Sequence, residues 1–110
     1  MKNRAINALV EMGMPADIKG FQYIVDAMCL FEAKEWRNGK TTVLYYKIGE
    51  INGVKPQNVE RSIRHAFKAT LAKGNPKVVK KYLSFECTTN GSQLHLLYIR
   101  LKQQEEEGES

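Results

Sequence analysis

Apolar residues recur every three or four positions along most of the chain, and no stretch alternates between apolar and polar over the length of a strand. Glycine and proline interrupt this helical pattern at several points. The interruptions leave six helical segments, over residues 5–13, 18–33, 41–53, 56–74, 75–83 and 92–101. The pattern therefore predicts an all-α fold, in which six helices form one bundle.

Several residues at the segment boundaries have the chemistry of helix ends. Gly13 suits a C-cap, because glycine takes a positive φ without steric cost. Thr41 or Thr42 is a candidate N-cap for the third helix, and Ser92 is one for the last helix. Asn75, which precedes a proline, predicts the start of a short fifth helix.

The stretch from Ile48 to Gly74 has the form of a helix-turn-helix, which lays its second helix into the major groove of DNA. Pro56 suits the first turn of that helix, where its missing N–H has no intrahelical partner. Four residues match the usual spacing of the motif, with glycines for close approach and a sharp turn: Gly49, Gly53, Val54 and Val59. Ser62 departs from the pattern, because an apolar residue is usual there.

The second helix of this motif has two chemically distinct faces. At 100° per residue, one stripe is formed by Val59, Ile63, Ala66, Phe67 and Thr70, and we expect it to be buried. The opposite face carries polar and basic side chains: Gln57, Arg61, Arg64, His65 and Lys68, with Asn58 and Glu60 on its flanks. This arrangement predicts a helix that packs on one side and is free to contact a partner on the other.

The polar face contains the side chains that read base edges. Arginine donates two hydrogen bonds to guanine, asparagine and glutamine pair with adenine, and glutamate accepts from the cytosine amino group. Recognition helices present their first turns to the bases. The candidate base readers are therefore Gln57, Asn58, Glu60 and Arg61, and the candidate contacts to the DNA backbone are Lys55, Arg64, His65 and Lys68.

The formal net charge is +5, from 17 basic and 12 acidic residues, and it is unevenly distributed. Four of the acids lie in residues 105–110, for which we expect a disordered acidic tail after a helical domain over residues 1–104. Between Lys55 and Lys81, eight basic residues accompany a single acid, Glu60. This local excess suits a phosphate backbone, although a solvated helix face has the same composition.

Two other classes of function fit the composition less well. A helical protein-interaction module that binds a polymerase subunit or another acidic partner is the alternative to a DNA-binding domain. An enzyme is disfavoured, because His65 and His95 are thirty residues apart and no carboxylate constellation accompanies them. Cys29 and Cys87 lack the spacing of metal ligands, so neither a metal nor a cofactor is expected.

The apolar runs, cysteines and aromatic residues indicate where the protein functions and what its aromatic side chains contact. No apolar run approaches the roughly 18–20 residues that span a membrane, and the N-terminus carries no secretion signal. Two isolated cysteines, with Cys29 expected as a buried thiol, favour a reducing cytoplasm. Trp36 and the Tyr45–Tyr46 pair suit either base stacking or core packing.

Two motifs in this chain resemble those of a known family. The first is GMPADIKGF at residues 13–21, and the second is VERSIRHA at residues 59–66, which is followed by KGN at residues 73–75. Together they resemble the DNA-binding effector domain of the stage zero sporulation response regulators, over about residues 5–103. The resemblance implies a helical transcription regulator that binds TGTCGAA-like boxes in double-stranded DNA, often as paired domains on tandem sites.

The resemblance also implies roles for particular residues. Glu60 and Arg61 stand at base-reading positions of the family, whereas Asn58 occupies a position where the best-known members carry arginine. Residues 74–82 correspond to a segment that contacts the RNA polymerase sigma factor, so the possible polymerase contacts are Gly74, Asn75, Val78, Val79 and Lys80. Family members carry an N-terminal phospho-receiver domain, for which this chain has no room. The chain is therefore expected to be either a cut-out effector domain or a stand-alone relative.

Overall fold

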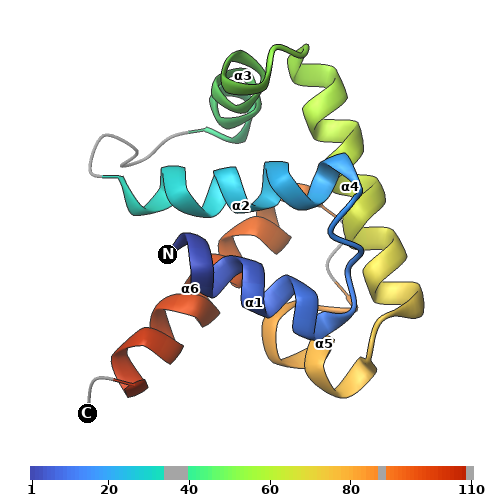
Figure 1. Cartoon of the computed structure of the whole chain (residues 1–110), viewed down its shortest axis with the longest axis vertical. Coiled ribbons are helices and arrows are strands. Elements are labelled where there is room, and N and C mark those ends of the chain that lie inside the picture. The colour runs from blue at the N-terminus through green and yellow to red at the C-terminus, as the bar shows by residue number, and fades with distance from the viewer. Residues whose placement is uncertain (34–39, 87–88, 109–110) are drawn as a thin grey trace.

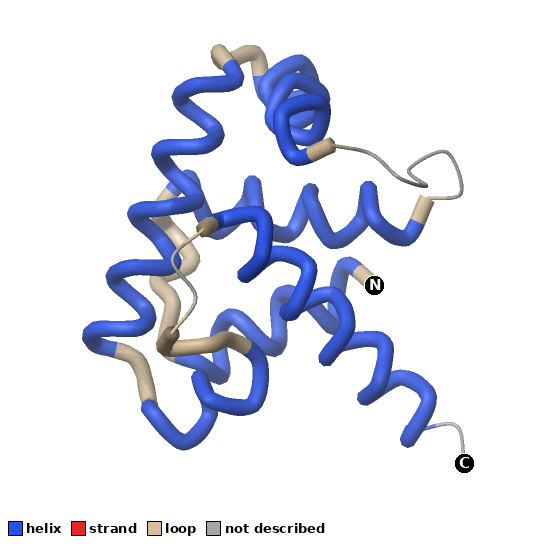
Figure 2. The backbone as a smooth tube through the Cα atoms, turned by 180° about the vertical axis from the view of Figure 1, so that it is seen from behind, coloured by secondary structure: helices blue, strands red, loops and turns tan. Residues whose placement is uncertain are grey.

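The computed structural model describes residues 1–33, 40–86 and 89–108, and these residues form six helices and no strands. The helices are α1 (Lys2–Met12), α2 (Lys19–Glu32), α3 (Thr41–Asn52), α4 (Pro56–Lys73), α5 (Pro76–Tyr82) and α6 (Asn90–Gly108). Figures 1 and 2 show them as one bundle, with α4 along one edge. This confirms the all-α, six-helix prediction. None of the helices in the described ranges is both long and apolar enough to cross a bilayer.

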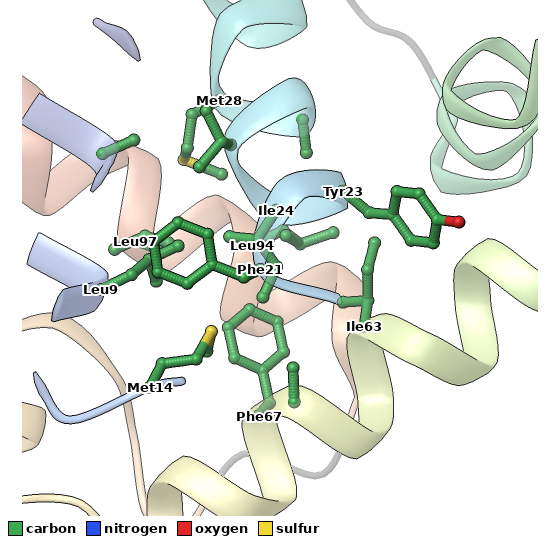
Figure 3. Close-up of a cluster of buried hydrophobic side chains, with 14 of the residues drawn as sticks. Leu9, Met14, Phe21, Tyr23, Ile24, Met28, Ile63, Phe67, Leu94 and Leu97 are labelled. Atoms are coloured by element: carbon green, nitrogen blue, oxygen red, sulfur yellow. The ribbon is translucent and has the colours of Figure 1, made fainter. Parts of the chain in front are cut away.

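The core forms around α2, which contacts α1, α3, α4 and α6. Its side chains Phe21, Ile24 and Met28 are buried, and they lie among residues from α1, α4 and α6, including Leu9 and Phe67 (Figure 3). Burial of apolar surface of this kind contributes roughly 25 cal/mol per Å² to folding. The near-continuous apolar sequence of α2 is thus explained by neighbours on most of its sides.

Glycines end two helices in the left-handed conformation, as the sequence predicts. Gly13 has φ 96° after α1, and Gly53 has φ 69° after α3. The end of α1 also meets the end of α4, since the Asn75 N–H donates to the Met12 carbonyl at 3.0 Å. A Cβ added at Gly74 would lie 2.5 Å from the same carbonyl oxygen, so the two chain segments approach through their backbones.

The N-cap predictions for α3 and α6 were wrong, whereas Asn75 does cap α5 by accepting from the Lys77 N–H at 3.1 Å. At α3 the cap position is Lys40, which makes no side-chain cap bond. At α6 the helix begins two residues before Ser92, and the Thr89 hydroxyl accepts from the Ser92 N–H at 3.3 Å. Threonine and serine share capping chemistry, so the sequence alone did not separate them.

The acidic end of the chain also differs from the prediction, because α6 continues through Gly108. Residues 105–108 are therefore helical, and residues 109–110 of the expected tail lie outside the described residues. Lys102 pairs with Glu105 one turn on, at 3.3 Å, which neutralises one charge of the acidic run. Lys102 also lies 3.5 Å from Glu32, so this part of α6 is attached to α2.

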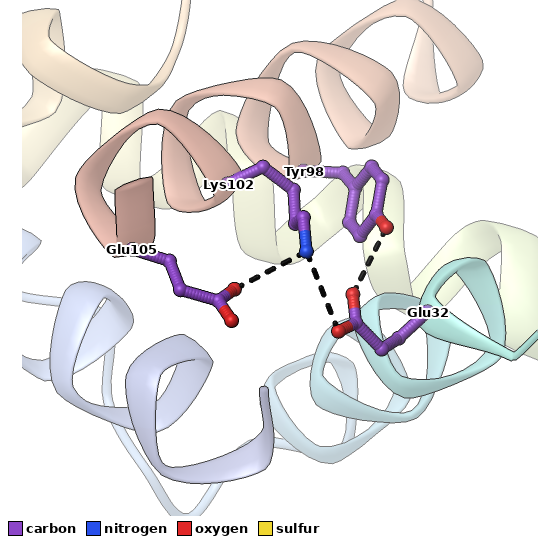
Figure 4. Close-up of polar contacts among 4 residues, drawn as sticks. All are labelled: Glu32, Tyr98, Lys102 and Glu105. Carbon is purple, nitrogen blue, oxygen red and sulfur yellow. Dashed lines mark hydrogen bonds and ion pairs between the residues drawn. The ribbon is translucent and has the colours of Figure 1, made fainter. Parts of the chain in front are cut away.

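A polar cluster holds α6 against the end of α2 (Figure 4). The Tyr98 hydroxyl donates to the Glu32 carboxylate at 3.0 Å, beside the ion pair between Lys102 and Glu32. Burial and the bond to Glu32 both raise the pKa of Tyr98. The hydrogen bond to Glu105 raises the pKa of Lys102. Tyr98 therefore stays a neutral donor and Lys102 a cation at neutral pH, and the cluster remains intact.

Candidate nucleic-acid interface

The corner between α3 and α4 depends on two glycines. A Cβ added at Gly49 would lie 2.5 Å from the Val54 carbonyl oxygen, a distance that real Cβ atoms do not reach. The Val54 N–H donates to the Gly49 carbonyl at 2.9 Å across the turn, and Gly53 between them is left-handed. The backbone thus folds directly onto the last turns of α3, as a helix-turn-helix requires.

The unusual Ser62 is explained by the crossing of α2 over α4. A Cβ at Gly20 would lie 2.3 Å from the Ser62 carbonyl oxygen and 2.7 Å from the Ala66 Cβ. The first turn of α2 therefore packs against the backbone of α4, and small residues on both helices permit this contact. Ser62 itself is partly exposed, so its side chain is not enclosed in the core.

The inner stripe of α4 is buried as predicted. All five of its residues are at most 3% exposed: Val59, Ile63, Ala66, Phe67 and Thr70. Phe67 projects into the central core beside Phe21 and Met14 (Figure 3). Thr70 is the one polar member, and its hydroxyl has no hydrogen-bond partner among the described residues. This burial fixes the rotation of α4 about its own axis.

The opposite side of α4 is open to solvent. The candidate base readers Gln57, Asn58 and Arg61 are exposed, whereas Glu60 is partly buried. The candidate backbone contacts are all exposed: Lys55, Arg64, His65 and Lys68. Because α4 lies along one edge of the bundle in both views, a partner can approach this side without moving another helix (Figures 1 and 2).

Glu60 differs from the other candidates because its side chain and its carbonyl both have partners. Its carboxylate forms an ion pair with the Arg64 guanidinium at 2.7 Å, one turn along the same helix. Its carbonyl oxygen accepts a hydrogen bond from the Asn90 amide at 2.9 Å. Asn90 was not among the predicted site residues, because no local pattern links positions thirty residues apart. Arg64, predicted to contact DNA phosphates, contacts Glu60 here.

All eight basic residues of the segment from Lys55 to Lys81 are exposed. Their single acidic neighbour, Glu60, is paired internally. The excess positive charge of this segment therefore lies on the surface of the described part of the chain. Such a surface attracts a polyanion at long range, with a strength that falls as salt is added.

A comparison with protein families gives a match over residues 5–100, to the model described as the C terminal of sporulation initiation factor Spo0A. This match covers most of the chain. The chain belongs to the Spo0A C-terminal family. It is therefore a non-enzymatic DNA-binding domain of a sporulation transcription regulator. The resemblance inferred from the motifs at residues 13–21 and 59–66 is confirmed.

In this Spo0A-type domain, the segment predicted to contact polymerase is only partly accessible. Val79 is fully buried, and Gly74 packs so closely that an added Cβ would lie 3.0 Å from the Val79 side chain. Asn75 and Lys80 are exposed, and Val78 is partly buried. Gly74 is partly buried like Val78, so a partner at this segment has four of the five predicted residues within reach.

The aromatic, cysteine and histidine residues of this family member divide between core and surface. Tyr45 is 8% exposed, whereas its neighbour Tyr46 is 63% exposed. Cys29 is partly buried, and burial raises the pKa of its thiol. His95 is exposed, with its ring 4.9 Å from that of Phe31. Trp36 and Cys87 lie outside the described residues.

Proposed function

We propose that this domain reads TGTCGAA-like boxes in the major groove through the first turns of α4. In this proposal, Gln57, Asn58, Glu60 and Arg61 face base edges, while Lys55, Arg64, His65 and Lys68 lie toward the phosphates. The observation that carries the proposal is that α4 is buried on one side and exposed on the other. Its inner stripe is at most 3% exposed, whereas three of the predicted readers, Gln57, Asn58 and Arg61, are exposed and Glu60 is partly buried.

The chemistry of the four readers supports selectivity for sequence as well as charge. Arg61 presents a fork of donors that matches the two acceptors of guanine, and Glu60 offers an acceptor for the cytosine amino group. Gln57 and Asn58 each offer one donor and one acceptor, which match adenine. Asn58 stands where arginine is usual in the resembled family, so we expect the preferred base at its position to differ from that of other members.

Substitution of Arg61 by alanine tests the assignment directly. Binding to a duplex that contains TGTCGAA should weaken by about 1–3 kcal/mol, whereas binding to a scrambled duplex should change little. Both affinities are measured by fluorescence anisotropy at one fixed salt concentration. Arg100→Ala, on α6, is the matched control and should leave both affinities unchanged. If the variant Arg61→Ala retains the full preference, α4 is not the reading helix.

We also propose that two copies occupy tandem boxes together, and that the accessible residues of the predicted segment, Gly74, Asn75, Val78 and Lys80, contact the sigma factor of RNA polymerase. The first part predicts a steeper titration on two boxes than on one. The second part predicts that Lys80→Glu reduces binding to the isolated sigma factor without changing the affinity for DNA. Equal titrations on one box and two, or an unchanged sigma interaction, would contradict the respective part.

A further inference from the structure

Asn90, the first residue of α6, links α6 to the first half of α4. Its side-chain amide donates to the Glu60 carbonyl at 2.9 Å. Tyr45 on α3 lines the same cavity as Asn90 and Glu60. Tyr45 is buried, and this burial raises its pKa, so the hydroxyl stays neutral. One amide thus connects the second helix of the helix-turn-helix to α6.

Glu60 is therefore held at two separate points. Asn90 fixes the main chain, and Arg64 fixes the carboxylate through one oxygen, Oε2, at 2.7 Å. Among the described residues, Asn90 supplies the one hydrogen bond that Glu60 receives from outside α4. A carboxylate has about four acceptor positions, so the bond to Arg64 leaves capacity for a base donor.

The position of Asn90 is itself set by contacts that do not involve α4. Gln93, one turn further along α6, is 2% exposed and accepts from the Ser84 N–H at 3.0 Å. Its amide also donates to the Ser84 carbonyl at 2.6 Å, which completes a reciprocal pair. Further along, Tyr98 and Lys102 attach α6 to Glu32 (Figure 4). Asn90 therefore projects from a helix that is fixed at two places.

An open cavity of about 700 Å³ borders this contact. Its walls include Tyr45, Glu60, Asn90 and His95, which come from α3, α4 and α6. Because this space is open to solvent, packing does not support Glu60 from that side. In the described part of the chain, the hydrogen bond from Asn90 is the polar contact that links Glu60 to α6, in addition to the packing of the buried stripe.

We infer that Asn90 is a positioning residue, which sets the place of Glu60 in the groove and so determines the preference at the base pair that Glu60 reads. The inference rests on the proposed function. Productive recognition geometry is held within about 0.5 Å, and it depends on supporting residues that do not touch the ligand. A hydrogen bond to the main chain of a reading residue controls the position of that residue to a similar precision.

A double-mutant cycle between Glu60 and Asn90 tests the inference. The probes are a TGTCGAA duplex and a series in which each base pair is replaced in turn. The substitution Glu60→Ala identifies the base pair at which Glu60 discriminates. With Glu60 present, Asn90→Ala should lower the preference at that same base pair roughly three- to ten-fold, the value of one hydrogen bond. In the Glu60→Ala background, Asn90→Ala should have no further effect.

Two additional variants separate positioning from folding. Asn90→Asp keeps the size of the side chain and adds an acid to the first turn of α6, where the helix dipole favours it. It cannot donate to the Glu60 carbonyl, so the preference should fall as in Asn90→Ala. The new charge should change the affinity for all duplexes by the same factor. It therefore cancels in the ratio of two affinities, which defines the preference. Ser92→Ala, in the same turn, removes an exposed hydrogen bond from the Thr89 hydroxyl but none to α4; it is the control and should retain the preference.

Each other outcome has a distinct meaning. If Glu60→Ala lowers the preference but Asn90→Ala and Asn90→Asp leave it intact, the inference is wrong and the proposed function stands. If Asn90→Ala acts equally in both backgrounds, Asn90 is structural and the inference is also wrong. If Glu60→Ala changes the preference at no base pair, Glu60 is not a reader, and its proposed role fails together with the inference.

Discussion

Two surface regions lie toward opposite ends of α4, and they differ in composition. The reading face, formed by Gln57, Asn58, Glu60 and Arg61, combines donors with acceptors. The lysine segment, formed by Lys73, Lys77, Lys80 and Lys81, offers point charges alone. Base edges present mixed patterns of donors and acceptors, whereas phosphates present only acceptors. Positive charge therefore marks where DNA or an acidic partner is attracted, and the mixture of side chains marks where sequence is read.

The two regions also differ in their attachment to the core. The reading face belongs to a long helix whose full burial is confined to one stripe, so most of its outer side chains are exposed. The lysine segment lies largely on α5, a helix of seven residues that buries Val79 and Tyr82. Substitutions in α5 should therefore mainly alter the stability of the domain, and substitutions in the reading face should mainly alter its recognition of DNA.

The largest effect is expected from Gly20→Ala, which acts on the reading face through its support. The new Cβ would meet the Ser62 carbonyl oxygen at 2.3 Å, so α2 and α4 must separate. We expect the free energy of unfolding to fall by about 3 kcal/mol. Urea denaturation measures it, and Gly108→Ala is the control, because no atom lies within 4 Å of that position. Equal stabilities of the two variants would contradict the close crossing.

The next effect concerns Val79 in the lysine segment. Because this side chain is fully buried, Val79→Ala should lower the free energy of unfolding by about 2 kcal/mol. Its effect on DNA preference should be negligible. Lys80→Ala, the exposed neighbour, should leave stability unchanged within about 0.5 kcal/mol. If Val79→Ala also leaves the free energy of unfolding unchanged, Val79 is available to a partner. The two regions then do not differ in their attachment to the core.

A smaller effect distinguishes the two regions by their salt dependence. Lys68→Ala should weaken binding to all duplexes alike and reduce the slope of log affinity against log salt by about 1. Lys80→Ala should leave that slope unchanged, because the lysine segment is proposed for a protein partner. Titrations at three or more salt concentrations give both slopes. A reduced slope for Lys80→Ala would extend the DNA surface onto α5.

The smallest effect is expected at Thr70, in the C-terminal half of α4 between the two regions. Its buried hydroxyl lacks a partner in the described part of the chain, so Thr70→Val should raise the free energy of unfolding, by less than about 1 kcal/mol. Thermal denaturation of both proteins, followed by calorimetry under the same conditions, measures the change. A loss of stability would instead indicate that the hydroxyl makes a hydrogen bond, for example to a bound water.

Most of the fold could be predicted from the sequence because its signals are local. The buried stripe of α4 follows from a 100° period, and Gly13 and Gly53 end helices because a positive φ suits glycine. Local signals failed where two residues had equal chemistry, as for Thr89 and Ser92 at the start of α6. They also failed for residues 105–108, whose helix follows from contacts of Lys102 with Glu32 and Glu105.

The candidate site likewise combines features that follow from local sequence with features that follow from the packing of distant helices. The exposed face of α4 could be predicted residue by residue, since neighbours on a helix are set by spacing alone. The contact between Asn90 and Glu60 could not, because it depends on how α6 lies against α4. The full burial of Val79 was missed for a related reason, as its surroundings come from the packing of α5 on other helices.

The backbone contact between Met12 and Asn75 has a mechanical consequence. It couples the end of α1 to the end of α4, about 22 Å along the helix axis from Asn58 at 1.5 Å per residue. A load applied to α1, for instance through a handle attached ahead of Met1 in a pulling experiment, would reach α4 at the end remote from the bases. Load also passes from α1 through α2, which crosses α4 beside Ser62, so the reading turns receive tension by this shorter route as well.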